Sequence, residues 1–174
     1  QRLFVGEYRQ VFGLNFPAML PAQIQIESGW RDGLTSSANA RGLCQFLEIT
    51  GENLERQNDG LAALARFSPA WCARAQSLLI RDLRRMVAEG RSPCPAHLFA
   101  AAGYVGSPST LRREIALCDA DPACNKNRWF MNVASKQSRR DDHFRESRNY
   151  VTKLYSLEPL YAESGRWGVS ICLR

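Results

Sequence analysis

The sequence predicts a mainly α-helical fold in a single domain, residues 1–174, on three observations. Apolar residues recur at helical spacing in several segments, and only the fragment AQIQI alternates as a strand would. No linker, internal repeat or low-complexity segment divides the chain. Its 174 residues, 45% hydrophobic and 23% charged, are typical of a soluble globular protein with one core.

The N-terminal half is expected to hold three helices. The first covers residues 17–30 and stops around Gly29, and it includes AQIQI because the neighbours of that fragment continue the helical row. A short helix is expected over residues 42–49. The clearest helix is AWCARAQSLLIRDLRRMVAEG, residues 70–90, with Gly90 as its C-terminal stop. We interpret its arginines as a solvated face and not as a nucleic-acid site.

The C-terminal half is expected to hold three more helices. Residues 96–104 are small and apolar, which suits a tightly packed helix. Ser107 is a good N-cap and Pro108 a good first helical residue, so a helix is expected over residues 108–118. The last helix covers residues 142–157, and its expected inner row is Phe144, Ser147, Arg148, Val151, Leu154 and Tyr155.

The chain carries a net charge of +6, from 23 Lys and Arg against 17 Asp and Glu. This charge favours anionic partners such as nucleic acid or a bacterial envelope, although an ordinary basic surface is the simpler explanation. No nucleic-acid-binding motif is present, so nucleic acid is not expected as a partner. No apolar run reaches the roughly 20 residues that span a bilayer. The N-terminal QRLFVGEYRQ has no signal-peptide pattern, and a removed signal peptide stays open.

Six cysteines favour an oxidising compartment, although buried free thiols explain them nearly as well. Cys118 and Cys124 flank the turn-like DADPA and are the easiest pair to close. Cys72 with Cys94 is the second expected pair. The chain has no CxxC motif and only two histidines, so neither a zinc site nor a cofactor is expected.

Glu27 is a carboxylate in an otherwise apolar helical row. At about 100° per residue it lies within about 20° of Leu20 and about 60° of Ile24, on or at the rim of the buried stripe. Burial disfavours the ionised form of a carboxyl group, and a protonated carboxyl can donate to a leaving oxygen. On the helix pattern alone, a rim glutamate with a backbone or arginine partner is the simpler interpretation.

Three motifs occur in order along the chain. ES at 27–28 is followed by GLCQ at 42–45, then by GYVGS at 103–107, and last by ESRNYV at 146–151. Together they resemble the soluble lytic transglycosylases, whose motifs are Glu-Ser with Gly-Leu-Met-Gln, then Ala-Tyr-Asn-Ala-Gly, then Glu-Thr-Arg-x-Tyr-Val. The first and third motifs match well and the second poorly.

The resemblance implies a lysozyme-like single domain with a substrate groove. It implies cleavage of the β-1,4 bond between N-acetylmuramic acid and N-acetylglucosamine in peptidoglycan. Glu27 would protonate the glycosidic oxygen and then take the proton of the muramic acid 6-hydroxyl, which attacks the anomeric carbon. The product is a 1,6-anhydro sugar, and no second catalytic carboxylate is used. The implied partner is the glycan strand, bound by a monomer.

Five further residues carry over from the motifs as substrate-binding groups, each with a simpler structural alternative. Ser28 and Gln45 would line the groove; the alternatives are a hydroxyl bonding back to a helix carbonyl and a surface glutamine. Tyr104 and Tyr150 offer a flat apolar face to a sugar ring, and Tyr150 would lie near the catalytic glutamate. Glu146 lies one helical turn before Tyr150. The alternatives are a core tyrosine and a glutamate paired with a basic neighbour.

Two positions depart from the family pattern. Cys44 replaces a methionine, and an oxidised Cys44 would instead staple the groove wall. Val105 replaces an asparagine that hydrogen-bonds the glycan, and valine cannot make that bond. Two alternatives therefore stay open, a hydrolytic muramidase with a second acid or a well-held water and a non-catalytic peptidoglycan-binding relative.

The remaining conspicuous side chains have structural interpretations. His97 and His143 lie beside no motif carboxylate or cysteine, and Trp129 and Trp167 are expected to pack. The cysteines and the implied substrate favour a periplasmic, extracellular or cell-envelope location. A bacterial and a phage origin both stay open.

Overall fold

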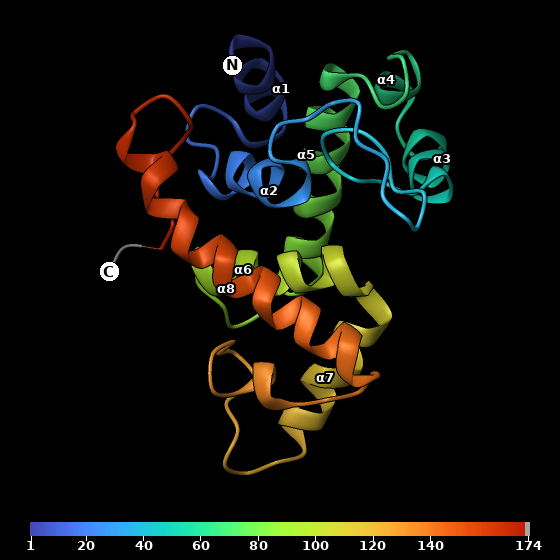
Figure 1. Ribbon diagram of the computed structural model, residues 1–174. Helices are drawn as coiled ribbons and strands as arrows, with labels where there is room; N and C mark the ends of the chain where they lie inside the picture. Colours follow the sequence, from blue (N-terminus) through green and yellow to red (C-terminus); the bar gives the residue numbers. More distant parts are fainter. Residues whose placement is uncertain (173–174) are drawn as a thin grey trace. The chain divides into compact units, whose positions relative to one another are not determined.

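The computed structural model describes residues 1–172, which form an array of helices (Figure 1). In chain order these are α1 (Arg2–Phe12), α2 (Met19–Ser28), α3 (Glu48–Arg56), α4 (Asp59–Ala62), α5 (Pro69–Met86), α6 (Pro93–Gly106), α7 (Pro108–Asp119), the 3-10 helix η1 (Val133–Ser135) and α8 (Asp141–Glu163). Extended backbone in the described residues pairs only as isolated bridges, such as Pro17 with Val169. The prediction of a mainly helical fold is confirmed.

The chain divides into two compact units. Among the described residues, unit 1 comprises Gln1–Arg81 and residues 157–172, and unit 2 comprises Asp82–Ser156. Both α5 and α8 contribute to the two units, because the boundaries fall inside these helices. The expectation that residues 1–174 act as a single domain stays a prediction.

α2 confirms the helix predicted over residues 17–30. Its residues from Met19 to Ile24 are buried. It ends at Gly29, whose φ of 58° and ψ of 35° are left-handed and whose N–H donates to the Gln25 carbonyl at 3.1 Å. Glycine takes this conformation without a Cβ penalty, so the Gly of ESGW sets the end of the helix.

The short helix predicted over residues 42–49 is wrong. Residues 42–45 form a turn, and the next helix, α3, begins only at Glu48. Gly42 and Gln45 lie in the left-handed region, with φ of 72° and 48°, which a right-handed helix does not allow. A Cβ at Gly42 would lie 3.2 Å from the Phe67 carbonyl oxygen, so this turn requires glycine.

A buried glutamine joins three helices of unit 1. Gln76 of α5 is fully buried and accepts a hydrogen bond from the Tyr8 hydroxyl of α1 at 3.0 Å. Its amide nitrogen donates to the Leu20 carbonyl of α2 at 2.9 Å. Buried polar groups need such partners, so these two bonds fix α1 and α2 against α5.

α5 confirms the helix predicted over residues 70–90, although it ends at Met86 and not at Gly90. Its arginines form a solvated face only in part. Arg85 is exposed, but burial lowers the pKa of Arg84, which shows that this guanidinium has lost much of its water.

α6 and α7 pack against each other in unit 2. The Ser107 hydroxyl accepts from the Thr110 N–H at 3.3 Å and Pro108 opens α7, which confirms the predicted cap and helix. A Cβ at Gly103 would lie 3.2 Å from Leu83 and 3.3 Å from Leu111. Glycine therefore lets α6 approach these two side chains closely.

α8 confirms the helix predicted over residues 142–157 and extends it to Glu163, with Pro159 inside it. Ser147, Val151 and Leu154 of the predicted inner row are buried. α1, α3 and α4 are additional helices that the sequence patterns do not predict.

All six cysteines are disulfide-bonded, so the free-thiol alternative is wrong. The predicted pair of Cys118 and Cys124 is confirmed, with a Cα–Cα distance of 5.3 Å. The second predicted pair, Cys72 with Cys94, is wrong because Cys72 bonds to Cys44 at a Cα–Cα distance of 5.7 Å.

The contacts around Cys44 explain its choice of partner. The next side chain but one, Phe46, packs edge-on against Trp71 of α5, with 5.6 Å between ring centroids. That aromatic contact lays residues 44–46 on the start of α5, directly beside Cys72. A long-range packing contact of this kind leaves no mark in sequence spacing.

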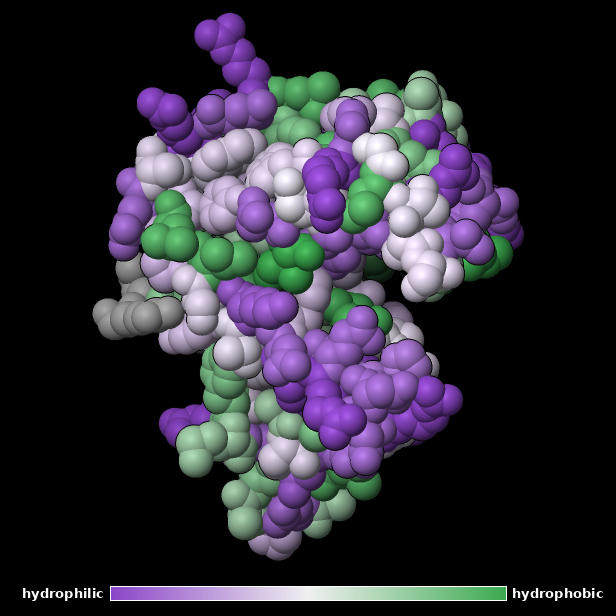
Figure 2. All heavy atoms as spheres, viewed as in Figure 1, coloured by the Kyte–Doolittle hydropathy of each residue, from purple (hydrophilic) through white to green (hydrophobic). Residues whose placement is uncertain are grey.

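On the face drawn in Figure 2, hydrophilic residues cover much of the surface and hydrophobic residues form smaller patches. Within residues 1–172, every helix is too short or too polar to cross a membrane.

Candidate active site

Glu27 lies in the last turn of α2, two residues before the left-handed Gly29. Its side chain is half-buried, whereas Leu20 and Ile24 on the preceding turns are fully buried. The predicted position at the rim of a buried stripe is therefore confirmed. A carboxyl group at such a rim can meet a substrate while apolar neighbours limit the access of water.

Aromatic side chains fix the chain directly after Glu27. Trp30 packs edge-on against Phe4, with 5.2 Å between ring centroids, and its ring lies tilted against that of Trp167 at 5.1 Å. Its indole nitrogen donates to the Tyr161 hydroxyl at 2.9 Å. Trp167 thus packs as predicted. The sequence patterns do not predict the contact between Trp30 and Tyr161. Only the position of Trp30 in ESGW, directly after the Glu-Ser pair, points to a role for it.

Ser28 is buried, and its hydroxyl donates to the Ile24 carbonyl at 3.3 Å. This is the helix-terminal contact that the sequence offers as an alternative to groove lining. Arg31 donates from Nε to the Ser28 carbonyl at 2.8 Å and satisfies another carbonyl at the end of α2. Both bonds stiffen the turn that carries Glu27, and a direct role of Ser28 in substrate binding stays a prediction.

Gln45 is half-buried in the turn that Gly42 opens. Its amide nitrogen donates to the Gly42 carbonyl at 2.8 Å and to the Leu34 carbonyl at 3.2 Å. The amide oxygen forms no hydrogen bond within residues 1–172 and remains an acceptor for a ligand N–H or O–H. The disulfide between Cys44 and Cys72 ties this turn to α5.

The carboxylates of α3 are paired with arginines, and Glu48 and Glu52 also meet Arg41 and Arg56. Arg66 forms ion pairs with Glu48, Glu52 and Glu55. Its hydrogen bonds lower the pKa of Glu55, with a further contribution from the indole of Trp71, so this carboxyl stays ionised. Asp32 is exposed to solvent. Glu55 is also half-buried in the last turn of its helix, but its carboxylate is paired with Arg66.

The second motif forms the last turn of α6 in unit 2. Tyr104 and Val105 are both half-buried there. The guanidinium of Arg139 lies directly against Gly106, where a Cβ would overlap it. Arg139 in turn forms an ion pair with the buried Glu114 of α7 at 3.0 Å. Gly106, the fourth residue of the motif, thus leaves room for this guanidinium.

The third motif contributes a structural arginine. Arg148 of α8 donates to the buried Glu114 carboxylate and to the backbone carbonyls of Val133, Ala134 and Lys136. Its guanidinium also lies 5.2 Å from the Trp129 ring centroid. Arg148 thus ties α7, the η1 region and α8 together.

Glu146 and Tyr150 differ sharply in exposure although they lie one turn apart on α8. The Glu146 side chain is 64% exposed, with its Oε2 atom 3.5 Å from Nδ1 of His143. Tyr150 is only 7% exposed. For Glu146, the sequence offers pairing with a basic neighbour as the alternative to substrate binding. The substrate contacts of Glu146 and Tyr150 stay predictions.

Glu114 is the main residue that sequence patterns miss. It lies among the apolar positions of α7, because Leu111 and Cys118 flank it at helical spacing and are also buried. A lone carboxylate in that row is the same kind of signal that singles out Glu27.

Two further residues have the predicted structural roles. His97 of α6 is fully buried, and burial, with a smaller effect of the Arg84 charge, lowers its pKa well below the usual value. Trp129 is 2% exposed and packs edge-on against Phe99, as expected of a packing residue. Among residues 1–172, no three His, Cys, Asp or Glu side chains gather closely enough to hold a metal ion.

The candidate residues fall in both units. Glu27, Ser28 and Gln45 belong to unit 1, and Tyr104, Glu146 and Tyr150 belong to unit 2. Their convergence on one substrate stays a prediction.

Comparison with protein families decides the affiliation, because the model of the transglycosylase SLT domain matches residues 13–126. The chain belongs to this SLT transglycosylase family. The match includes Glu27, the turn at residues 42–45 and the second motif. It confirms the expected family. A search of curated proteins finds no match.

The SLT fold is also found among solved structures. The chain is similar to the lytic transglycosylase Slt from Pseudomonas aeruginosa, determined by X-ray crystallography as an inactive mutant, with a TM-score of 0.67 and 17% sequence identity. The similarity covers 98% of this chain and 25% of that one, so the chain spans about a quarter of the length of that protein. It confirms the predicted lysozyme-like helical fold.

Proposed function

We propose that this SLT domain cleaves the β-1,4 bond between N-acetylmuramic acid and N-acetylglucosamine in peptidoglycan and leaves a 1,6-anhydro-muramic acid end. The observation that carries the proposal is the place of Glu27, half-buried in the last turn of α2 inside the region that matches the family. Supporting contacts fix its neighbours, Ser28 at the end of the same helix and Trp30 just beyond it.

Glu27 acts first as general acid. It donates its proton to the glycosidic oxygen, so that the bond to the anomeric carbon of muramic acid breaks. It then accepts the proton of the 6-hydroxyl as that oxygen attacks the same carbon. One carboxyl group thus gives up one proton and takes one back, and no water is consumed.

The motifs assign a catalytic role to one carboxylate of unit 1, Glu27, and none to Asp32. A hydrolytic glycosidase places a second carboxylate across the scissile bond. In unit 1, Glu48, Glu52 and Glu55 are held by Arg66. We therefore prefer the anhydro-forming reaction to hydrolysis.

Gln45 is the group of unit 1 best suited to orient the glycan. Its amide nitrogen is satisfied by the loop, so its amide oxygen faces a ligand as an acceptor. The N–H of a sugar N-acetyl group is a matching donor. Tyr104 and Tyr150 are proposed to contribute a ring face and a hydroxyl from unit 2, with Ser28 and Glu146 as further groove residues.

All six cysteines are disulfide-bonded, which supports work in an oxidising compartment such as the periplasm or the cell exterior, where peptidoglycan lies.

Glu27→Gln tests the proposal. The amide keeps the size of the side chain but cannot exchange the proton, so solubilisation of purified peptidoglycan should fall at least about 10³-fold. Sedimentation of the variant with insoluble peptidoglycan should be retained. A Glu27→Gln protein that solubilises peptidoglycan at the native rate would remove Glu27 from the mechanism. Sedimentation without any release by the native protein would favour the non-catalytic alternative.

A further inference from the structure

A hollow of about 400 Å³ lies in unit 2. Its walls come from the end of α5, the turn that leads into α6, the solvent side of α7 and the segment that follows the disulfide of Cys118 and Cys124. None of the residues that line it belongs to the three sequence motifs. A volume of this size suits a small ligand or the end of a peptide.

The walls of the hollow are held in place before any ligand arrives. Arg91 donates to the Val87 carbonyl at 2.7 Å and to the Lys126 carbonyl at 2.5 Å, so it joins two walls. Its guanidinium also lies 4.2 Å from the ring centroid of Phe99. Preformed walls reduce the ordering cost of binding.

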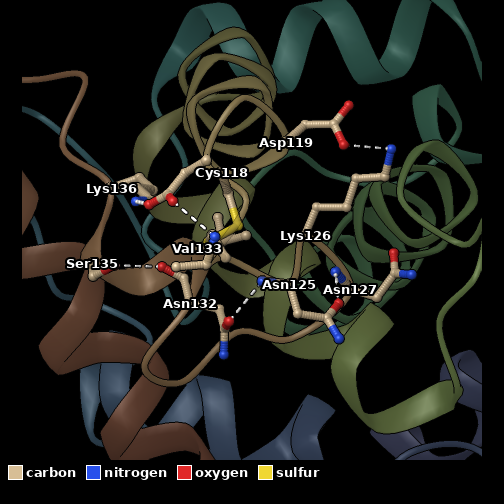
Figure 3. The surroundings of a disulfide bond; sticks show 12 residues. Cys118, Asp119, Asn125, Lys126, Asn127, Asn132, Val133, Ser135 and Lys136 are labelled. Atoms are coloured by element: carbon tan, nitrogen blue, oxygen red, sulfur yellow. Dashed lines mark hydrogen bonds and ion pairs between the residues drawn. A yellow bond between two sulfur atoms is a disulfide. The ribbon is translucent and has the colours of Figure 1, made fainter.

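The disulfide shapes the wall that follows α7. Cys118 lies on α7, and its bond to Cys124 brings the chain back so that Lys126 faces Asp119 (Figure 3). The N–H of Asn125 donates to the Asn132 side chain at 2.8 Å and fixes the other end of this segment.

The hollow combines an apolar floor with charges of both signs. Met86, Val87 and Ile115 supply the apolar part. At the rim, Lys126 and Asp119 form an ion pair at 2.8 Å. Arg112 and Glu89 also line the hollow, and neither side chain has an ion pair within residues 1–172, although the charge of Glu89 acts on Arg91.

This charge pattern selects the class of ligand. A simple anion would meet Arg112 but also the carboxylates of Glu89 and Asp119. A neutral sugar would leave Arg112 without a counter-charge, and Glu89 with only the charge of Arg91, with which it forms no ion pair. A short aliphatic group with one carboxylate and one ammonium answers both charges and covers the apolar floor.

We propose that this hollow binds the zwitterionic end of a short peptide, with the carboxylate on Arg112, the ammonium on Glu89 and the aliphatic body over Met86, Val87 and Ile115. The proposal rests on the function proposed above, because that function supplies the peptide. The stem peptides of peptidoglycan carry free carboxylate and amino groups. Unit 2 would then recognise the peptide that accompanies the glycan.

A synthetic stem tripeptide that ends in a diamino dicarboxylic acid tests the site by calorimetric titration into the full chain. Saturable binding is expected, weaker by about tenfold in Arg112→Gln and in Glu89→Gln, since each change removes one charge-assisted hydrogen bond. Both side chains are exposed, so both variants should fold. Arg145→Gln is the matched control, an exposed arginine of α8 outside the hollow, and should bind as the native protein does.

A tripeptide with its amines acetylated and its carboxylates amidated separates recognition of the charges from recognition of the backbone. It should not bind. Equal binding of the blocked peptide would overturn the proposal, as would native affinity in Arg112→Gln or no saturation up to about 10 mM peptide. The titration requires no catalysis and can be repeated on Glu27→Gln. Its failure is thus distinguishable from failure of the proposed reaction, which product analysis measures.

Discussion

The carboxylate of Glu114 on α7 lies 2.9 Å from the guanidinium of Arg148 on α8, and it is fully buried. It also pairs with Arg139, so one carboxylate compensates two arginine side chains that are 8% and 13% exposed. Removing one partner of a buried ion pair leaves uncompensated charge. The Arg of the third motif is therefore a structural residue of unit 2.

Glu114→Ala should lower the free energy of unfolding by about 3–5 kcal/mol, because Arg139 and Arg148 would stay buried without a counter-charge. Urea unfolding followed by circular dichroism measures the change. Glu163→Gln, at an exposed carboxylate near the end of α8, is the control and should stay within about 0.5 kcal/mol of the native protein. A Glu114→Ala protein as stable as this control would contradict the structural role.

The disulfide between Cys44 and Cys72 should support both stability and activity. It closes a loop with a sequence separation of 28, for which chain entropy predicts a loss of about 3–4 kcal/mol when both cysteines become serine. The same change at Cys118 and Cys124, with a separation of 6, should cost about 2 kcal/mol. Thermal unfolding compares the two variants.

The Cys44→Ser, Cys72→Ser protein should also release less glycan at temperatures where it stays folded. The turn that holds Gln45 loses its covalent tie to α5, although the packing of Phe46 on Trp71 remains. Full activity of this variant would show that the turn is positioned without the disulfide.

The burial of His97 should make the protein less stable in acid. Its pKa is lowered in the folded chain, mainly by burial, whereas the unfolded chain takes up a proton below about pH 6.5. Below that pH the unfolded state binds more protons than the native state, so the free energy of unfolding falls as pH falls, by at most about 1.4 kcal/mol per pH unit from this group.

His97→Leu should remove this part of the acid sensitivity. Both ring nitrogens of His97 are buried without a hydrogen bond in the described part of the chain, so leucine should cost little at pH 7.5 and should stabilise relative to the native protein at pH 5. Urea titrations at the two pH values measure the difference. An unchanged slope of stability against pH in His97→Leu would refute the assignment.

Val105 offers a gain-of-function test. It is half-buried at the end of α6, at the position where the family motif has an asparagine. Val105→Asn adds a hydrogen-bonding amide, and one net hydrogen bond corresponds to an increase in kcat/KM of about three- to tenfold. Release of muropeptides measures it. A Val105→Asn protein with no gain would indicate that another residue already supplies the contact.

Local signals account for what the sequence predicts well. Gly29 ends α2, Ser107 and Pro108 begin α7, and the short separation of Cys118 and Cys124 gives their pairing. Long-range packing accounts for what it predicts badly. The turn at residues 42–45 depends on the contact of Gly42 with Phe67, and the pairing of Cys44 with Cys72 depends on the contact of Phe46 with Trp71. In each contact the two residues lie more than twenty positions apart in the sequence.

The candidate site divides in the same way. The place of Glu27 at the rim of the buried stripe follows from a helical period of 3.6 residues, and the motifs carry the family. The commitment of the Gln45 amide nitrogen to two loop carbonyls depends on the folded backbone. The pairing of Arg148 with Glu114 depends on it too, because helical spacing indicates that each lies on a buried face but not that the two meet.

Mass spectrometry of the muropeptides released from purified peptidoglycan tests the central claim most directly. The native protein should release products lighter by one water than hydrolytic muropeptides, and Glu27→Gln should release none. Products with ordinary reducing ends, or anhydro products from Glu27→Gln, would contradict the reaction proposed for Glu27.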